Sequence, residues 1–387
     1  MPAAVAAQDV IAEARRLTPL LAEYAEEAEA GRRPPAVVMD ALREARIFEL
    51  MTPERFGGLE LDVDTFLDVG LALAEGDASM GWLTGFYVMH NWMFSHFPME
   101  FQEQIYASGS YVLAPAAIAP SGTAEEVDGG FRVSGRWSWG TGINDADEWV
   151  IVGSFTPNPD GGRPKIWMCA VPRDEVRVED TWHTSGMRAT GSHDMIIENA
   201  FVPAERTVLA SVMAEGVESP LHDAPLYRLP MMPMLMLAVA LPAVGQAKAS
   251  VRRFAETIQN RTLLGTKTKQ SETAAAQMRL ARAELEVLQA EQQVRVMVAE
   301  LMELRNNAQV PDRARLAAKL AIAVDQSKRV IQSLAESSGA SVYFSKDPLQ
   351  RALRDVQMGS CHPTLNLDFR LEMLGRVMLG LDPGGPV

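Results

Sequence analysis

Hydrophobic and polar positions change their spacing twice along the chain and divide it into three zones. In the first zone, up to about residue 110, Asp9 to Ala30 is rich in the helix-forming residues Ala, Glu and Leu. Pro34-Pro35 opens a second expected helix that ends near Phe48, and Gly57-Gly58 marks a loop after it. The apolar stretch from Asp62 to His96 contains Gly, Ser and Ala, which favour close packing between helices. The first zone is therefore expected to be helical.

The middle zone, from about residue 111 to 225, has the period of β-strands. Four apolar side chains occupy alternating positions after a Gly-Gly turn and predict a half-buried strand: Phe131, Val133, Trp137 and Trp139. Turn signals such as Asn158 to Gly162 separate further short β-like runs: Trp149 to Val152, Ile166 to Val171 and Met195 to Ile197. Short strands with this spacing predict a small barrel or sandwich.

From about residue 226 the helical period returns. Met278, Ala281, Leu285 and Leu288 form an amphipathic stripe. The nearly uncharged stretch from Leu229 to Gly245 is short for a membrane span and is interrupted by prolines, so we expect it inside the protein. The order of zones predicts an α+β protein with three domains: a helical domain at 1–110, a β domain at 111–225 and a helical domain at 226–387.

Composition narrows the class of protein. The 387 residues carry a net charge of −14, and 47% of them are hydrophobic. This share of apolar residues excludes a disordered chain, and the negative charge argues against binding to nucleic acid. Only two cysteines occur, Cys169 and Cys361, which fits a reducing compartment rather than a disulfide scaffold. With no evident signal peptide or membrane span, we expect a soluble, cytoplasmic protein.

Five motifs carry a resemblance to a known family: Met51 to Leu59 (MTPERFGGL), Gly135 to Gly142 (GRWSWGTG), Trp182 to Pro203, Arg261 to Gly265 (RTLLG), and Ser338 to Asp355. In this order they resemble the acyl-CoA dehydrogenase fold. The chain looks most like the oxygenase components of two-component flavin-dependent (group D) aromatic monooxygenases. The resemblance implies an N-terminal helical domain, a central β-barrel or sandwich, and a C-terminal four-helix bundle.

Two departures from the dehydrogenase pattern favour the oxygenase branch. The stretch Leu113 to Gly122 lacks the acidic pair of the dehydrogenase T-E-P-x-x-G-S-D motif. The position of the dehydrogenases' catalytic Glu falls at about Phe369, although Asp368 and Glu372 lie close enough for a shift in register to supply a base. The oxygenases instead have a His shortly after the Arg-Asp helix, and His362 matches it.

The resemblance also implies the chemistry. Reduced FMN or FAD would come from a separate NAD(P)H-flavin reductase and react with O2. The resulting flavin C4a-hydroperoxide would hydroxylate an aromatic substrate, which could be phenolic, indolic or polycyclic. A flavin is needed because side chains do not activate oxygen unaided. No G-x-G-x-x-G motif follows a strand, so direct nicotinamide binding is not expected.

His362 is the candidate catalytic residue. It would accept a phenolic proton near neutral pH or hydrogen-bond the hydroperoxide directly; the competing interpretation is a helix-capping histidine. His90 resembles a substrate-pocket histidine of the oxygenases, but a buried, hydrogen-bonded core histidine fits nearly as well. The histidines lack the spacing of metal ligands, so no metal site is expected.

The resemblance assigns further residues to the flavin. Thr141 occupies the position whose hydroxyl bonds flavin N5, and Trp139 would pack against the ring. Thr190 and Ser192 offer hydroxyl donors, and Arg261 is a candidate phosphate partner. For Trp139 and Thr141 the alternative is an aromatic β-core position, and for Arg261 it is a helix-surface arginine.

The substrate wall is expected from apolar residues. Met231, Met232 and Phe94 are the candidates beside His90, because thioethers make adaptable apolar walls for flat ligands, and Trp82 and Phe86 could join the same wall. Two other activities remain open: an acyl-CoA dehydrogenase with tightly bound FAD, and an N- or S-oxygenase of the same fold. The family usually forms homotetramers with flavin at subunit interfaces.

Overall fold

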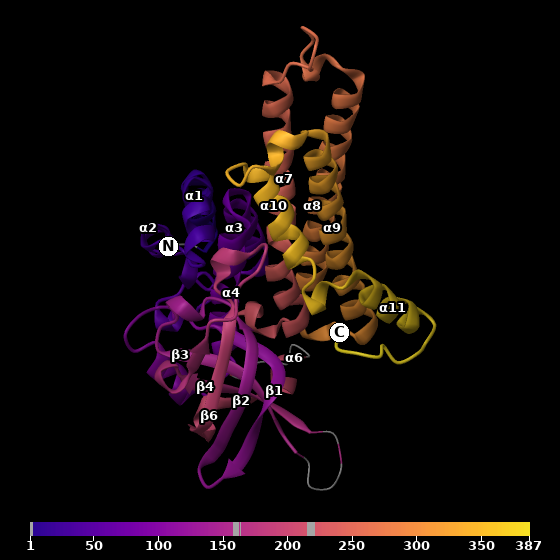
Figure 1. Cartoon of the computed structure of the whole chain (residues 1–387). Coiled ribbons are helices and arrows are strands. Elements are labelled where there is room, and N and C mark those ends of the chain that lie inside the picture. Colours follow the sequence, from indigo (N-terminus) through magenta and orange to yellow (C-terminus); the bar gives the residue numbers. More distant parts are fainter. Residues whose placement is uncertain (1–2, 158–161, 163, 215–220) are drawn as a thin grey trace.

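A computed structural model describes residues 3–157, 162, 164–214 and 221–387. The expected turn at Asn158 to Gly162 lies almost wholly outside the described residues. Helices come first and last along the chain, with one sheet between them (Figure 1). The α+β class predicted from the sequence is confirmed.

The N-terminal region is helical, as expected. Its helices are α1 (Ala3–Gly31), α2 (Ala36–Glu44), α3 (Val63–Gly76), α4 (Ala78–Phe94) and α5 (Met99–Ile105). Helix α1 continues through Pro19. The apolar stretch at 62–96 forms two helices, and Asp77 separates them by accepting a hydrogen bond from the backbone N–H of Met80 (2.9 Å). That contact is an N-cap for α4.

The middle region forms one seven-stranded sheet of order β5-β6-β2-β1-β3-β4-β7. Its strands are β1 (Ala116–Val127), β2 (Gly130–Gly140), β3 (Trp149–Thr156), β4 (Lys165–Pro172), β5 (Arg177–Glu179), β6 (His193–Pro203) and β7 (Thr207–Leu209). Neighbours pair antiparallel except β1 and β3, which are parallel. The sheet curls around an apolar cluster of its own that includes Phe131, Val133 and Trp137.

The C-terminal region contains α6 (Ala210–Ala214), α7 (Met231–Asn260), α8 (Ala274–Leu304), α9 (Val310–Ser337), α10 (Pro348–Gly359) and α11 (Leu367–Met378). Helices α7, α8 and α9 stand side by side and extend away from the sheet (Figure 1). By length and composition α7 is apolar enough to cross a membrane, but 89% of its most apolar window is buried inside the protein. It is the central helix of the core, as the uncharged stretch predicted.

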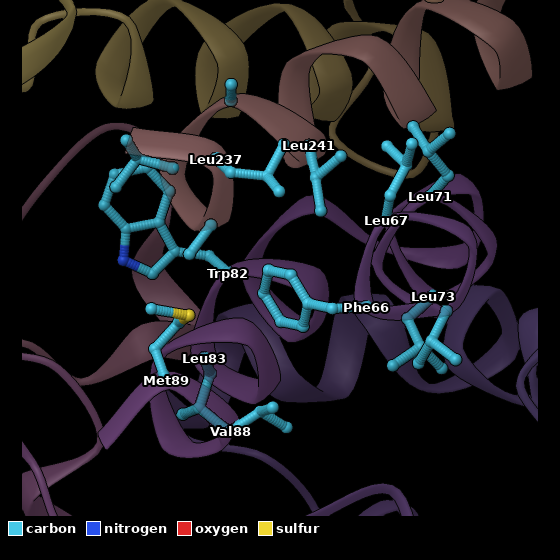
Figure 2. Packing of buried hydrophobic residues seen from close by; sticks show 14 of the residues in the cluster. Phe66, Leu67, Leu71, Leu73, Trp82, Leu83, Val88, Met89, Leu237 and Leu241 are labelled. Carbon is cyan, nitrogen blue, oxygen red and sulfur yellow. The ribbon is translucent and has the colours of Figure 1, made fainter. Parts of the chain in front are cut away.

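Helices α3, α4 and α7 pack so closely that side chains larger than hydrogen do not fit at several contacts (Figure 2). A Cβ atom on Gly70 would lie 2.4 Å from Leu241 Cδ1, and one on Gly81 would lie 2.9 Å from Ala74. The close packing expected from the small residues at 62–96 is confirmed, and it fixes the position of Trp82 on α4.

The amphipathic stripe on α8 does not face the core of this chain, contrary to the simplest interpretation of its pattern. Met278, Leu285 and Leu288 are exposed, while the buried face of α8 is formed by other residues, among them Val287, Val294 and Met297. The period of the helix was predicted correctly, but the stripe points away from the subunit.

Candidate functional site

One face of α4 carries a row of rings one helical turn apart. The rings of Trp82 and Phe86 stack with centroids 5.3 Å apart, and Phe86 meets His90 edge-on at 5.5 Å. Residues four apart share a helix face, so this contact sequence follows from their spacing. The row makes an aromatic wall with Trp82 at one end and His90 at the other.

His90 is held by the backbone of the segment that enters the sheet. Its Nδ1 lies 2.6 Å from the carbonyl oxygen of Ala114. A carbonyl only accepts, so Nδ1 carries the proton and Nε2 keeps its lone pair. Burial lowers the pKa of His90 to about 4, so the ring is neutral at physiological pH.

His362 lies against the other side of Trp82, with ring centroids 5.7 Å apart. It begins the short turn at Pro363–Leu365, where its Nδ1 accepts from the backbone N–H of Thr364 (3.3 Å) and contacts the Thr364 hydroxyl (2.8 Å). Since Nδ1 accepts, the proton of the neutral ring is on Nε2. Burial, followed by the positive charge of Arg370, lowers the pKa of His362 to about 4.

This geometry changes the chemistry expected of His362. A neutral ring with a pKa of about 4 is a weak base, and its basic nitrogen already accepts from Thr364. Its free polar group is an N–H donor. Of the two roles predicted from the sequence, this arrangement favours hydrogen-bond donation over acceptance of a phenolic proton. The capping contact with Thr364 is also present.

A chain of hydroxyl groups begins at Trp82. The indole Nε1 donates to Thr141 Oγ1 (3.4 Å), which lies 3.0 Å from Ser192 Oγ. Ser192 Oγ is 2.7 Å from Thr190 Oγ1, and Thr190 donates to the carbonyl oxygen of Met187 (2.8 Å). Because Thr190 donates to Met187, Ser192 can donate to Thr190 and Thr141 to Ser192, so Thr141 donates to a ligand only by turning its hydrogen away from Ser192.

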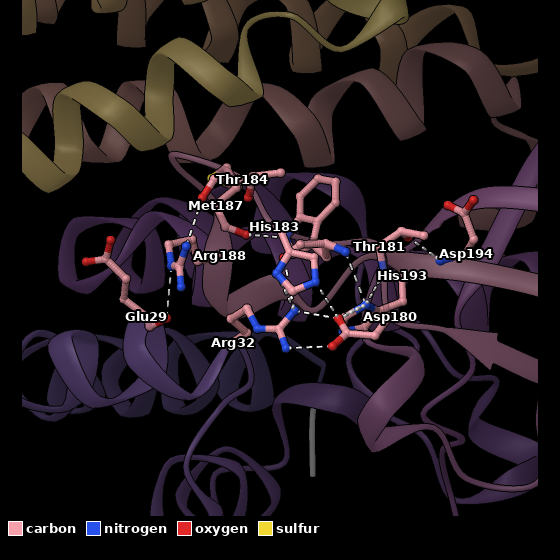
Figure 3. Close-up of polar contacts among 11 residues, drawn as sticks. Glu29, Arg32, Asp180, Thr181, His183, Thr184, Met187, Arg188, His193 and Asp194 are labelled. Atoms are coloured by element: carbon pink, nitrogen blue, oxygen red, sulfur yellow. Dashed lines mark hydrogen bonds and ion pairs between the residues drawn. The ribbon is translucent and has the colours of Figure 1, made fainter.

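The loop that carries Thr190 and Ser192 is fastened to α1 (Figure 3). Arg32 forms a two-pronged ion pair with Asp180, with contacts of 2.5 and 2.9 Å. On the other side of the loop, Arg188 donates to the carbonyl oxygens of Glu29 (3.3 Å) and Thr184 (3.0 Å). The hydroxyl groups are therefore held on a rigid support.

Two buried carboxyl groups join the elements of the site. Asp355 on α10 accepts from the backbone N–H of Met187 (2.6 Å), and Asp77 caps α4. Arg351 Nε lies 4.0 Å from Asp77 Oδ2. Burial raises the pKa of Asp77 to about 6 and that of Asp355 to about 7, where the charge of Asp77 adds to the effect. Helix α4, helix α10 and the loop of Thr190 thus meet at one buried acidic pair.

Trp139 lies outside the sheet's core, although alternation along β2 placed it with Trp137. The pairing of β2 with β6 shifts in register between Trp137 and Gly140, and Trp139 has a positive φ of 68°. Its ring is 58% exposed, two residues before Thr141. The bulge turns the ring out of the β core and leaves a flat apolar face exposed.

The remaining predicted residues lie elsewhere in the subunit. Arg261 follows the last residue of α7 and donates to the carbonyl oxygen of Ser338, at the end of the bundle far from the sheet (Figure 1). Phe94 packs with Phe97 and Phe101 in the core. Met231 and Met232 begin α7, whereas Val239, Pro242 and Ala243, two to three turns further on, line the small cavity beside Trp82.

Sequence analysis identified His362, His90, Thr141, Thr190 and Ser192 as candidates, with Trp82 and Phe86 as possible wall residues. In the structure His362 and Thr141 contact Trp82, His90 follows through Phe86, and Ser192 and Thr190 follow through the hydroxyl chain. The acidic pair and the contact of His362 with Thr364 were not predicted. The acidic pair joins residues far apart in sequence and left no local signal.

The donors and surfaces present fit a flavin ring. Thr141 offers a hydrogen that can leave Ser192, and Trp139, two residues before it, offers an exposed aromatic face. Within the described residues, no cluster of three or more His, Cys, Asp or Glu side chains is arranged to hold a metal ion. On α11 the carboxyl groups of Asp368 and Glu372 are exposed, and the buried face of that helix carries Arg370 and Met373.

Comparison with known proteins gives a consistent result. Residues 237–367 match the family described as acyl-CoA dehydrogenase, C-terminal domain. The flavin-dependent monooxygenase oxygenase subunit HsaA of Rhodococcus jostii is 31% identical over 94% of this chain and 97% of its own length. The oxygenase component of an FADH2-dependent resorcinol hydroxylase from Rhizobium is 29% identical over 95% and 93%.

The fold comparison agrees. The structure of XiaF from Streptomyces, in complex with FADH2 and glycerol, superposes with a TM-score of 0.90 at 28% identity, covering 99% of this chain and 98% of that one.

Proposed function

The chain belongs to the flavin-dependent monooxygenases, as an oxygenase component with the acyl-CoA dehydrogenase fold, and from this membership we propose that it hydroxylates an aromatic substrate. It would use O2 and reduced FMN or FAD delivered by a separate NAD(P)H-flavin reductase. The observation that carries the proposal is the aromatic wall of Trp82 and Phe86, flanked by His90 and His362 and continuous with the hydroxyl chain.

Each side chain has a separate task in this proposal. Thr141 donates to the flavin, with Ser192 and Thr190 behind it, and Trp139 packs on the ring. Bound reduced flavin supplies the activation of O2 that side chains cannot perform. His90 offers the Nε2 lone pair to a substrate hydroxyl, and His362 donates its Nε2 hydrogen toward the reacting atoms. The apolar wall excludes water around them.

A flat aromatic substrate with one hydroxyl group suits this site. Its ring can stack on the aromatic side chains, and its hydroxyl group can donate to the single acceptor, His90 Nε2. The name of the resorcinol hydroxylase relative agrees with a phenolic substrate. The proposal does not rely on Phe94, Met231 and Met232 as substrate contacts, because Phe94 packs in the core and none of the three lines the small cavity beside Trp82. The exposed positions of Asp368 and Glu372 argue against an acyl-CoA dehydrogenase, which needs a carboxylate facing the substrate.

We also propose that the working enzyme is a homotetramer. The outward stripe of Met278, Leu285 and Leu288 leaves apolar surface that a second subunit would cover. Arg261 is too far from Thr141 to reach the same flavin, because the stretch of α7 from Ala243, at the cavity beside Trp82, to Arg261 rises by about 27 Å. Its role as a phosphate partner therefore requires a neighbouring subunit. The free cysteines, Cys169 and Cys361, support a reducing cytoplasmic location.

The test is an anaerobic titration of the purified protein with reduced FMN and with reduced FAD, followed by admission of oxygen with a panel of phenols and indoles. We expect saturable binding of at least one reduced flavin and a product heavier than the substrate by one oxygen atom. Dye reduction by an acyl-CoA thioester, with no oxygenated product from any aromatic compound, would establish the dehydrogenase instead.

A further inference from the structure

Arg370 is a buried cation on α11, and its side chain is 2% exposed. Within the described residues no Asp or Glu oxygen comes within 4.0 Å of its guanidinium. Its partners are two carbonyl oxygens, the sulfur of Met373 (3.5 Å) and the ring of Phe369, whose centroid lies 5.6 Å from the guanidinium carbon. Burying an unbalanced charge is costly, so the position calls for an explanation beyond packing.

The first carbonyl belongs to the turn that holds His362. Arg370 Nε donates to the carbonyl oxygen of Thr364 at 2.8 Å. The backbone N–H and the hydroxyl of the same Thr364 are the groups that contact His362 Nδ1. Thr364 therefore bonds the imidazole through its backbone N–H and the guanidinium through its carbonyl oxygen. Arg370 in this way fixes the turn from which His362 projects.

The second carbonyl belongs to the segment 382–387, which folds back over α11. Arg370 Nη1 donates to the carbonyl oxygen of Pro386 at 2.7 Å, and Arg313 Nε donates to that of Val387 at 3.3 Å. Gly385 fits closely against the ring of Phe369, since a Cβ atom there would lie 2.7 Å from Phe369 Cζ. These contacts seat the segment on the guanidinium.

We propose that Arg370 is a positioning residue for His362, acting through Thr364, and that residues 382–387 hold Arg370 in place. The proposal rests on the proposed function for the importance of His362, but its contacts do not require a bound flavin. A line of hydrogen bonds thus runs from a segment remote in sequence to the imidazole at the aromatic wall.

The positive charge of Arg370 also affects His362, in addition to the contacts that orient the ring. A cation near an imidazole disfavours the protonated ring, and burial does so more strongly. Helix α4 presents the uncharged Trp82 to His362, and the turn presents Thr364, so Arg370 is the charged group whose field acts on the ring. The result is a ring that is both oriented and neutral.

The experiment measures the pKa of each histidine in the flavin-free full chain by hydrogen–deuterium exchange at the imidazole C2 position, read by mass spectrometry. In Arg370→Met we expect the pKa of His362 to rise by about one unit or more toward its usual value. His90, whose pKa is lowered by burial alone, stays unchanged and serves as the internal control.

Two further variants test the role of the segment. Gly385→Val keeps the Arg370 side chain but displaces the segment that holds it in place, so we expect this variant also to raise the pKa of His362 and to speed exchange at that ring. Gly375→Ala, on the same helix with no atom within 4 Å of the added methyl, should leave His362 as it is.

An unchanged His362 in folded Arg370→Met would overturn the proposal. Should that variant fail to fold, an unchanged His362 in Gly385→Val would overturn it equally. Failure of the wild-type protein to oxygenate any aromatic compound would instead contradict the proposed function, and it would leave these exchange measurements intact.

Discussion

At His362 the position of one proton determines which chemistry the side chain performs. Because Nδ1 accepts from Thr364, the ring donates through Nε2. Glutamine places an amide N–H near the same point, whereas alanine removes the donor. We expect His362→Ala to lower the oxygenated product formed per NADH by roughly tenfold, the value of one hydrogen bond, and His362→Gln to retain much of the yield. Equal loss in both variants would point to a general base.

The same ring predicts a pH profile. Burial and Arg370 lower the pKa of His362 to about 4, so it is neutral from pH 6 to pH 8. Product yield over that range should therefore show no inflection near pH 6.5 that belongs to His362. The measurement is the yield of the wild type and of His362→Gln at each pH. An inflection near pH 6.5 present only in the wild type would contradict the assignment.

Asp355 predicts how stability depends on pH. Its pKa is raised by burial and by Asp77, so between about pH 4 and pH 7 the folded protein retains a proton that the unfolded chain has lost. Stability from this group is full below pH 4 and is lost as the pH rises to about 7. An asparagine side chain at this position cannot ionise, and its amide oxygen can still accept from the Met187 N–H.

The variant Asp355→Asn should therefore lose less stability than the wild type between pH 5 and pH 8. We expect the fall in Tm over this range to shrink by about 2 °C or more, measured by differential scanning calorimetry. Asp368→Asn, at an exposed position on α11, is the matched control and should follow the wild type. If Tm falls equally with pH in all three proteins, ionisation of the acidic pair does not control stability over this range.

At the scale of elements, the site depends on one close backbone contact. The loop carrying Thr190 passes α10 at Gly186, where a Cβ atom would lie 2.3 Å from the carbonyl oxygen of Arg354 and 2.8 Å from the nitrogen of Asp355. Both are backbone atoms, so the loop would have to move. It would take with it the Met187 N–H that Asp355 holds.

Gly186→Ala should therefore weaken reduced-flavin binding by roughly fivefold or more, as expected for the loss of about one hydrogen bond, with a lower Tm. The measurement is the dissociation constant from anaerobic titration. Gly375→Ala, where alanine meets no atom and favours the helix by about 0.5–1 kcal/mol, should bind flavin as the wild type does. Wild-type binding by Gly186→Ala would show that the loop tolerates the shift.

The elements also show where sequence patterns stop being informative. The alternation of apolar residues located β2 correctly, because burial of one face of a strand leaves this alternation in the local sequence. It misplaced Trp139, since a bulge depends on the pairing of β2 with β6 and not on β2 alone. The helical period described the stripe on α8 without its direction, because a stripe has the same period whether it faces its own core or another subunit.

At the scale of the whole molecule, sequence analysis identified the α+β class and the family through motifs in a fixed order. Within the site it identified side chains whose types stand in recognisable motifs, such as His362 and Thr141. The links among them escaped it. Asp355 with Met187, and Arg370 with Pro386, are bonds to backbone atoms, which carry no residue signature. Only the folded chain brings these partners together.

The direction of the α8 stripe leads to a prediction about assembly. Leu285 is 59% exposed in the single chain and lies at the centre of the stripe. If a second subunit covers it, a carboxylate there would be buried without a partner, which costs several kcal/mol across a symmetric interface. Leu285→Glu should therefore reduce the mass measured by light scattering from that of a tetramer to a smaller species.

Assembly and flavin binding should then fail together. If Arg261 binds the flavin of a neighbouring subunit, as we propose, the dissociated Leu285→Glu protein should bind reduced flavin weakly although its own Thr141 and Trp82 are intact. Arg282→Glu is a suitable control, because it places the same carboxylate on α8 at an exposed position outside the stripe. A monomeric variant that binds flavin as tightly as the wild type would show that one subunit contains the whole site and that Arg261 takes no part in it.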